Sequence, residues 1–155
     1  MYLGIKLLHI AAVILFLGNI ITGLFWHRHA ARTRDPALLA HTMDGIIRSD
    51  RWFTIPGVVL IIVFGIIAAV LARLPILGTG WILWSIVLFA ISGAAFMWKV
   101  APLQRRLRDF AHAGIGGGFD YAAYDRLATR WEIWGGVALA APLAALVLMV
   151  LKPDL

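Results

Sequence analysis

The feature that most constrains this chain is a set of four long apolar runs, each the length of a membrane-spanning helix. A helix needs about 20 predominantly apolar residues to cross a bilayer. The runs cover residues 3–26, 52–71, 81–100 and 131–151. Only 14% of the residues are charged, whereas a soluble domain is about one quarter charged. The sequence therefore predicts an all-α membrane protein in which a single domain, residues 1–155, forms a four-helix transmembrane bundle.

The basic residues predict how these spans are oriented. Ten of the fourteen Lys and Arg residues lie in two polar segments, residues 27–51 and 102–130. Short basic loops stay on the cytoplasmic side of a membrane. We therefore predict that both segments are cytoplasmic loops and that both chain termini face the other side (N-out/C-out). The same bias accounts for the net charge of +6, so we predict no nucleic-acid partner.

The two polar segments contain signals for short helices. In the first, Asp35 and Pro36 are a typical helix cap and first helical residue. They predict a short amphipathic helix over residues 36–48, with its apolar side chains lying on the membrane. In the second, the run GIGGG at residues 114–118 predicts a flexible link between two short polar helices. Pro56, near the start of the second span, either bends that helix or marks its first turn.

His9 is the sharpest candidate for function, because an ionisable side chain at membrane depth costs free energy and is retained mostly where it has a role. With the predicted orientation it lies about two helical turns into the outer leaflet. Three interpretations are open: a histidine hydrogen-bonded to a neighbouring helix, a ligand of haem or another metal, and a proton relay.

A haem held by two side chains needs both of them at one depth. His27 lies on the same helical face as His9 but about 27 Å away, so the two cannot share one metal within a subunit. Met149 and Lys152, at the end of the fourth span, lie at the depth of His9 and are candidates for a second ligand. A group from a second subunit and a five-coordinate iron are the alternatives.

Two further polar residues lie in the first span. Lys6 shares a helical face with His9. Its ammonium group either extends to the outer interface or pairs with a haem propionate or another anion near His9. Asn19, near the middle of the membrane, is typical of side chains that hydrogen-bond across helices.

An arginine directly precedes the tryptophan that opens the second span, and another precedes the one that opens the fourth. Arg and Trp side by side suit the headgroup region. Arg51 and Arg130 are therefore either anchors at the interface or parts of a common anion- or lipid-binding site, with Asp50 and Glu132 as counter-charges.

Several functional classes lack support in the sequence. The chain has no cysteine, which excludes disulfides and thiolate metal sites. It has no nucleophile–base arrangement, carboxylate pair or His-Glu metal motif, so we predict no hydrolase. It shows no internal repeat of the kind found in secondary transporters. If the chain is an enzyme, a haem-dependent membrane oxidoreductase is the class indicated.

Four stretches of the chain resemble the domain-of-unknown-function family 2269 (DUF2269). They are KLLHIAAVILFLGNIITGLFW, DPALLAHTM, DRWFTIPGVV and TRWEIWGGVALAAPLAALVLMVLKP. The resemblance implies a four-helix integral membrane protein of the bacterial inner membrane. A weaker resemblance, to HemJ-type protoporphyrinogen oxidases and CopD-like membrane proteins, depends on Lys6, Leu8 and His9. It implies that His9 binds haem.

Two function hypotheses follow. In the first, the chain is a small redox-associated membrane protein that binds haem b through His9. In the second, it is a non-catalytic subunit or scaffold whose Gly and Ala faces mediate assembly, as a homo-oligomer or within a larger membrane complex. The lipid bilayer surrounds the protein in both.

Overall fold

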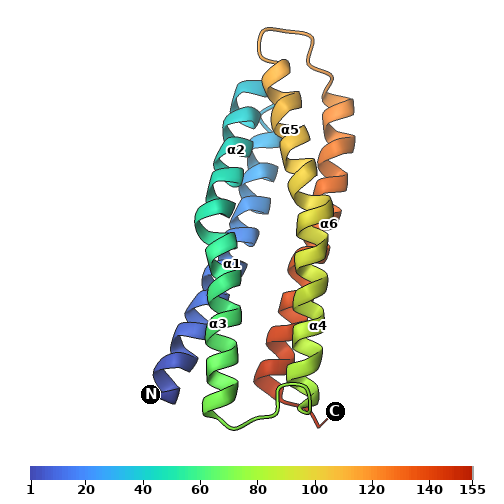
Figure 1. The fold of residues 1–155 in the computed structure, drawn as a ribbon. Coiled ribbons are helices and arrows are strands. Elements are labelled where there is room, and N and C mark those ends of the chain that lie inside the picture. The colour runs from blue at the N-terminus through green and yellow to red at the C-terminus, as the bar shows by residue number, and fades with distance from the viewer. Residues whose placement is uncertain (155) are drawn as a thin grey trace.

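The structure is a computed structural model that describes residues 1–154, and every regular element in it is a helix (Figure 1). The elements are α1 (Tyr2–Ala31), α2 (Pro36–Ser49), η1 (Asp50–Thr54), α3 (Ile55–Leu71), α4 (Gly80–Ala95), η2 (Phe96–Val100), α5 (Ala101–Ala113) and α6 (Tyr121–Leu151). They form four rods that run alternately up and down, and both chain ends lie at the same end of the bundle. Each rod is long and apolar enough to cross a membrane. The predicted all-α bundle with four membrane-spanning helices is confirmed.

The short helices predicted in the two polar segments are present, but they prolong the spans instead of standing apart from them. The segments α2, η1 and α3 form one continuous helix of 36 residues, and α4, η2 and α5 form one of 34 residues. At 1.5 Å per residue these helices are about 54 and 51 Å long, well beyond the roughly 30 Å hydrocarbon thickness of a bilayer. The bundle therefore continues past its apolar stretches as a four-helix extension, made by α2, α5 and the adjoining ends of α1 and α6 (Figure 1).

The short helix expected to lie on the membrane stands upright in this extension. Its start is as predicted, since the Asp35 side chain accepts a hydrogen bond from the Ala37 N–H. Its apolar residues Leu39, Met43 and Ile46 are buried in a core that they share with residues of α5 and α6. The amphipathic face was thus correctly recognised, but it packs against other helices of the same chain.

Both long helices change pitch directly before a proline. The Ile55 N–H donates to the Asp50 carbonyl and the Ala101 N–H donates to the Phe96 carbonyl, each five residues back, so η1 and η2 are single π-helical turns. Pro56 and Pro102 follow within two residues. A proline lacks an N–H and its ring collides with the carbonyl four residues earlier. The wider turn accommodates that ring, so Pro56 lies in the first turn of α3, as one of the two predictions had it, without interrupting the continuous helix.

Small residues bring the helices together in pairs. A Cβ added at Gly57 of α3 would lie 3.3 Å from the Cβ of Phe16 in α1. The Ser92 hydroxyl of α4 donates to the Ala138 carbonyl of α6 at 2.6 Å. Along α6 the buried residues recur with alternating spacings of four and three, which is the heptad pattern of left-handed helix packing. They are Tyr124, Ala128, Trp131, Gly135, Ala138, Pro142 and Ala145.

Gly135 and Gly136 offer a direct test of this packing. A Cβ at Gly135 would lie 3.1 Å from Leu24 Cδ2, whereas one at Gly136 would meet nothing within 4 Å. We expect Gly135→Leu to lower the free energy of unfolding in detergent by about 1–3 kcal/mol through overpacking. The adjacent Gly136→Leu should change it by less than about 0.5 kcal/mol. Equal effects of the two variants would contradict this helix orientation.

Candidate functional site

A buried carboxylate lies where the apolar stretches meet the helical extension. Asp50 is the first residue of η1 and is almost completely buried. Its Oδ1 accepts hydrogen bonds from Asn19 Nδ2 of α1 at 3.0 Å and from the Thr54 hydroxyl at 2.7 Å. Its Oδ2 accepts one from Gln104 Nε2 of α5 at 2.8 Å. The carboxylate therefore links three of the four rods, and the predicted bond from Asn19 to another helix is present.

Neutral groups supply all three of these hydrogen bonds. Among the described residues no Lys, Arg or His forms an ion pair with Asp50. The structure thus assigns Asp50 to a polar network inside the bundle rather than to Arg51 as its counter-charge. A cavity of about 20 Å³, room for one water molecule, adjoins the cluster and is lined by Asn19, Asp50, Gln104 and Trp131, among others. Trp131 Nε1 is buried and has no acceptor among the described residues.

A second buried group lies further along α1, in the helical extension. His27 has no exposed surface, and its Nε2 lies 3.1 Å from the Tyr124 hydroxyl of α6. Its Nδ1 lies 3.5 Å from Glu132 Oε1, and Glu132 Oε2 accepts from the Arg28 guanidinium at 2.9 Å. If the phenol donates to Nε2, the imidazole proton is on Nδ1 and faces the carboxylate. Glu132 is therefore paired with Arg28 and not with Arg130, and it lies next to His27 Nδ1, which has no hydrogen-bond partner among the described residues.

His9 lies between α1 and α3 at the end of the bundle that holds the termini. Its Nδ1 is 3.0 Å from the Ile61 carbonyl oxygen, across the helix pair. Gly65 makes room for the ring, since a Cβ there would lie 3.1 Å from His9 Cε1. A carbonyl can only accept, so Nδ1 carries the proton and Nε2 has a free lone pair. Within residues 1–154 Nε2 makes no hydrogen bond, and the protein does not enclose this atom completely.

The other residues predicted around His9 are not brought together with it. Lys152, at the end of α6, places its Nζ 5.5 Å from the centre of the Trp81 ring of α4. Met149 is partly buried on α6, and Lys6 is exposed on α1. None of the three makes a hydrogen bond or ion pair with His9. Among residues 1–154 no group of three His, Cys, Asp or Glu residues is arranged to hold a metal ion, and the roles predicted for these side chains stay predictions.

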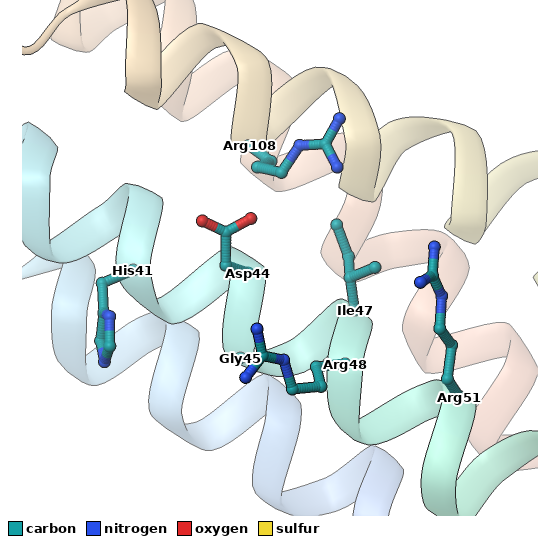
Figure 2. Close-up of a pocket in the computed structure, with 7 residues that line it drawn as sticks. All are labelled: His41, Asp44, Gly45, Ile47, Arg48, Arg51 and Arg108. Atoms are coloured by element: carbon teal, nitrogen blue, oxygen red, sulfur yellow. The ribbon is translucent and has the colours of Figure 1, made fainter.

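The second predicted site, with two arginines, is divided between separate surfaces. Arg51 lines a groove of about 460 Å³ together with Arg48, Arg108 and other residues of α2 and α5. Figure 2 shows Arg108 reaching in from α5, while the remaining residues line the opposite side. Arg130 is exposed on α6 and is not part of this groove.

Gln104 and Tyr124 are site residues that the sequence analysis missed. Both lie in the polar segment 102–130, for which the sequence predicts two short polar helices joined by a flexible link and no buried core. The heptad spacing of Tyr124 with Ala128 and Trp131 would have placed the tyrosine on the buried face of α6. The same spacing joins Gln104 to Val100, Leu107 and Ala111 and would have placed the amide on the buried face of α5.

The network around Asp50 predicts a large effect of removing its carboxylate. Asp50→Ala removes the acceptor of the Thr54 hydroxyl and of the Gln104 amide, while Asn19 Nδ2 keeps its hydrogen bond to Thr54 Oγ1. We expect the variant to lower the free energy of unfolding by about 3 kcal/mol or more. In the double variant Asp50→Asn/Gln104→Glu, the carboxylate and the amide exchange places, so we expect partial recovery relative to Asp50→Ala. Asp125→Ala, which removes an exposed carboxylate, is the control and should cost less than about 1 kcal/mol. An Asp50→Ala effect as small as that of the control would contradict a structural role for the network.

Comparison with known proteins places the chain in a family. No curated protein and no solved structure matches it. The model of DUF2269, described as a predicted integral membrane protein, matches residues 3–153. That range includes all four membrane-spanning helices and the extension. The chain therefore belongs to the DUF2269 family and is a multi-pass integral membrane protein.

Proposed function

We propose that this protein binds haem b in the bacterial inner membrane, with His9 as an axial ligand and both chain termini on the non-cytoplasmic side. The observation that carries the proposal is the hydrogen bond of His9 Nδ1 to the Ile61 carbonyl. A histidine that ligates a metal almost always donates its other ring N–H to a carbonyl or carboxylate. Such a bond fixes both the tautomer and the orientation of the ring.

The surroundings of His9 support a ligand role more than a packing role. A purely structural histidine tends to use both ring nitrogens, since a polar atom left unpaired in an apolar setting costs free energy. Here only Nδ1 is bonded, and Nε2 is neither paired nor sealed inside the bundle. Haem bound there would supply reversible one-electron transfer.

Two other residues stay candidates for the surroundings of the haem, although neither contacts His9. Lys6 lies one helical turn before His9, so its ammonium group can pair with a propionate on the same face of α1. Met149 lies at the same end of the bundle as His9 but on α6. It is our candidate for the second axial position, with a five-coordinate iron or a group from a second subunit as the alternatives.

The orientation follows from the placement of charge. Both termini lie at one end of the bundle, and the opposite end carries ten of the fourteen Lys and Arg residues. The positive-inside rule assigns the basic end to the cytoplasm. His9 then lies toward the outer face of the membrane.

The test is a visible absorption spectrum of the detergent-purified protein, expressed with an adequate supply of haem. We expect a Soret band that shifts on reduction with dithionite and is lost in His9→Ala. His29→Ala removes an exposed imidazole from the same helix and should leave the band unchanged. In His9→Gly, added imidazole should restore the band, which separates loss of a ligand from loss of the fold.

A flat spectrum of the unaltered protein, or a Soret band that persists in His9→Ala, would overturn the proposal. Co-purification of the colourless protein with a larger membrane complex would then support the alternative, a non-catalytic subunit. Gly135 is a poor probe of such assembly, because it already packs against Leu24 of the same chain. Gly136, which faces open space, is the better position to alter.

A further inference from the structure

We propose that the groove between α2 and α5 binds the phosphate group of an anionic phospholipid at the membrane surface. Three arginines line this groove of about 460 Å³: Arg48 on α2, Arg51 on η1 and Arg108 on α5 (Figure 2). A guanidinium group presents paired N–H donors that match the oxygens of a phosphate. This site lies at the opposite end of the bundle from His9 and does not depend on haem.

No carboxylate among the described residues pairs with Arg48 or Arg51. Three carboxylates lie in neighbouring positions of the same helices, and each is already bonded to another group. Asp50 accepts from three neutral donors inside the bundle. Asp44, which lines the groove, lies 2.8 Å from His112 Nε2. Asp109 pairs with Arg108 at 2.7 Å.

Because these three carboxylates are bonded to other groups, the groove keeps a positive charge that favours binding of an anion from outside the protein. Neither Arg48 nor Arg51 forms an ion pair among the described residues. Of the three guanidinium groups in the lining, that of Arg108 already donates to Asp109 through Nε and Nη2. Arg48 and Arg51 therefore face a single lining carboxylate, that of Asp44. Asp44 repels a phosphate less strongly than a free carboxylate would, because its Oδ2 lies within hydrogen-bond distance of His112 Nε2.

The level of the groove favours a lipid over a soluble phosphate compound. Arg51 directly precedes the second apolar stretch, and the next residue, Trp52, has 72% of its surface exposed. Trp98, near the end of the third apolar stretch, is 76% exposed. Exposed tryptophans at the ends of membrane spans mark the headgroup region. A basic pocket between helices at this level is a suitable place for an anionic headgroup, whose acyl chains would lie along α3.

The experiment uses the full-length protein in a nonionic detergent and measures bound lipid by native mass spectrometry. Phosphatidylglycerol is compared with phosphatidylcholine of the same acyl chains. We expect preferential binding of phosphatidylglycerol and at least about a tenfold loss of affinity in Arg48→Gln/Arg51→Gln, since two charge-assisted contacts are removed. Arg51→Lys, which keeps the charge but not the paired donors, should give an intermediate loss.

The matched control removes the same charge outside the groove. Arg105 and Arg106 are exposed on α5 and do not line the groove. Arg105→Gln/Arg106→Gln should keep the affinity for phosphatidylglycerol within about twofold, because it changes only the general attraction between charges. Lipid-free unfolding temperatures of both double variants should match that of the unaltered protein, since all four arginines are on the surface.

Three results would overturn the proposal. Equal losses in the two double variants would indicate unspecific attraction to the basic end of the bundle. Equal affinity for phosphatidylglycerol and phosphatidylcholine would show that the groove does not distinguish an anionic headgroup from a neutral one. Displacement of phosphatidylglycerol by glycerol 3-phosphate or inorganic phosphate at comparable concentration would assign the groove to a soluble phosphate compound instead of a lipid.

Discussion

The buried carboxylate of Asp50 is the interaction on which the arrangement of the helices depends. An acidic side chain inside a bundle costs free energy unless every lone pair that loses water gains a donor. Here the donors come from α1, from η1 itself and from α5. Apolar contacts tolerate rotation or sliding of a helix, whereas these bonds do not. Asp50 therefore fixes the register of three rods at the level where the apolar stretches end.

The two π-helical turns make this arrangement possible. Each widened turn shifts the face that the following residues present, because it inserts one residue into the helical ladder. In η1 the turn begins at Asp50 itself, and η2 ends four residues before Gln104. Pro56 and Pro102 give both turns a local cause. Two prolines that would weaken ordinary helices thus lie next to the polar network, and the hydrogen bonds of that network stabilise the altered geometry.

The sequence predicts the membrane-spanning part of this fold well because the bilayer allows few alternatives. A chain in hydrocarbon must satisfy its backbone internally, so an apolar run of 20 residues is a helix. Outside the membrane that constraint is absent, and polar composition is compatible with loops as well as with helices. The sequence therefore predicts short helices in the two polar segments but not their packing into a core, although the buried residues Leu39, Met43 and Leu107 follow helical spacing. Asp50 and Glu132 were assigned to the nearest arginines in sequence, because pairing across helices depends on rotations that sequence distance does not specify.

The polar side chains of α1 connect the two ends of the molecule. His9 bonds the backbone of α3, Asn19 bonds Asp50, and His27 bonds Tyr124 of α6. These residues are 10 and 8 positions apart, or about 15 and 12 Å along the helix. Helices α3 and α6 are thus bonded to α1 directly, and α5 is linked to it through Asp50. Helix α4 is held to α6 by Ser85 and Ser92. His27 Nδ1 also lacks a hydrogen bond among the described residues, but it is buried. Of these three residues on α1, only His9 has an unpaired ring nitrogen that the protein does not enclose completely. His9 is therefore the residue at which we expect the chemistry of the protein.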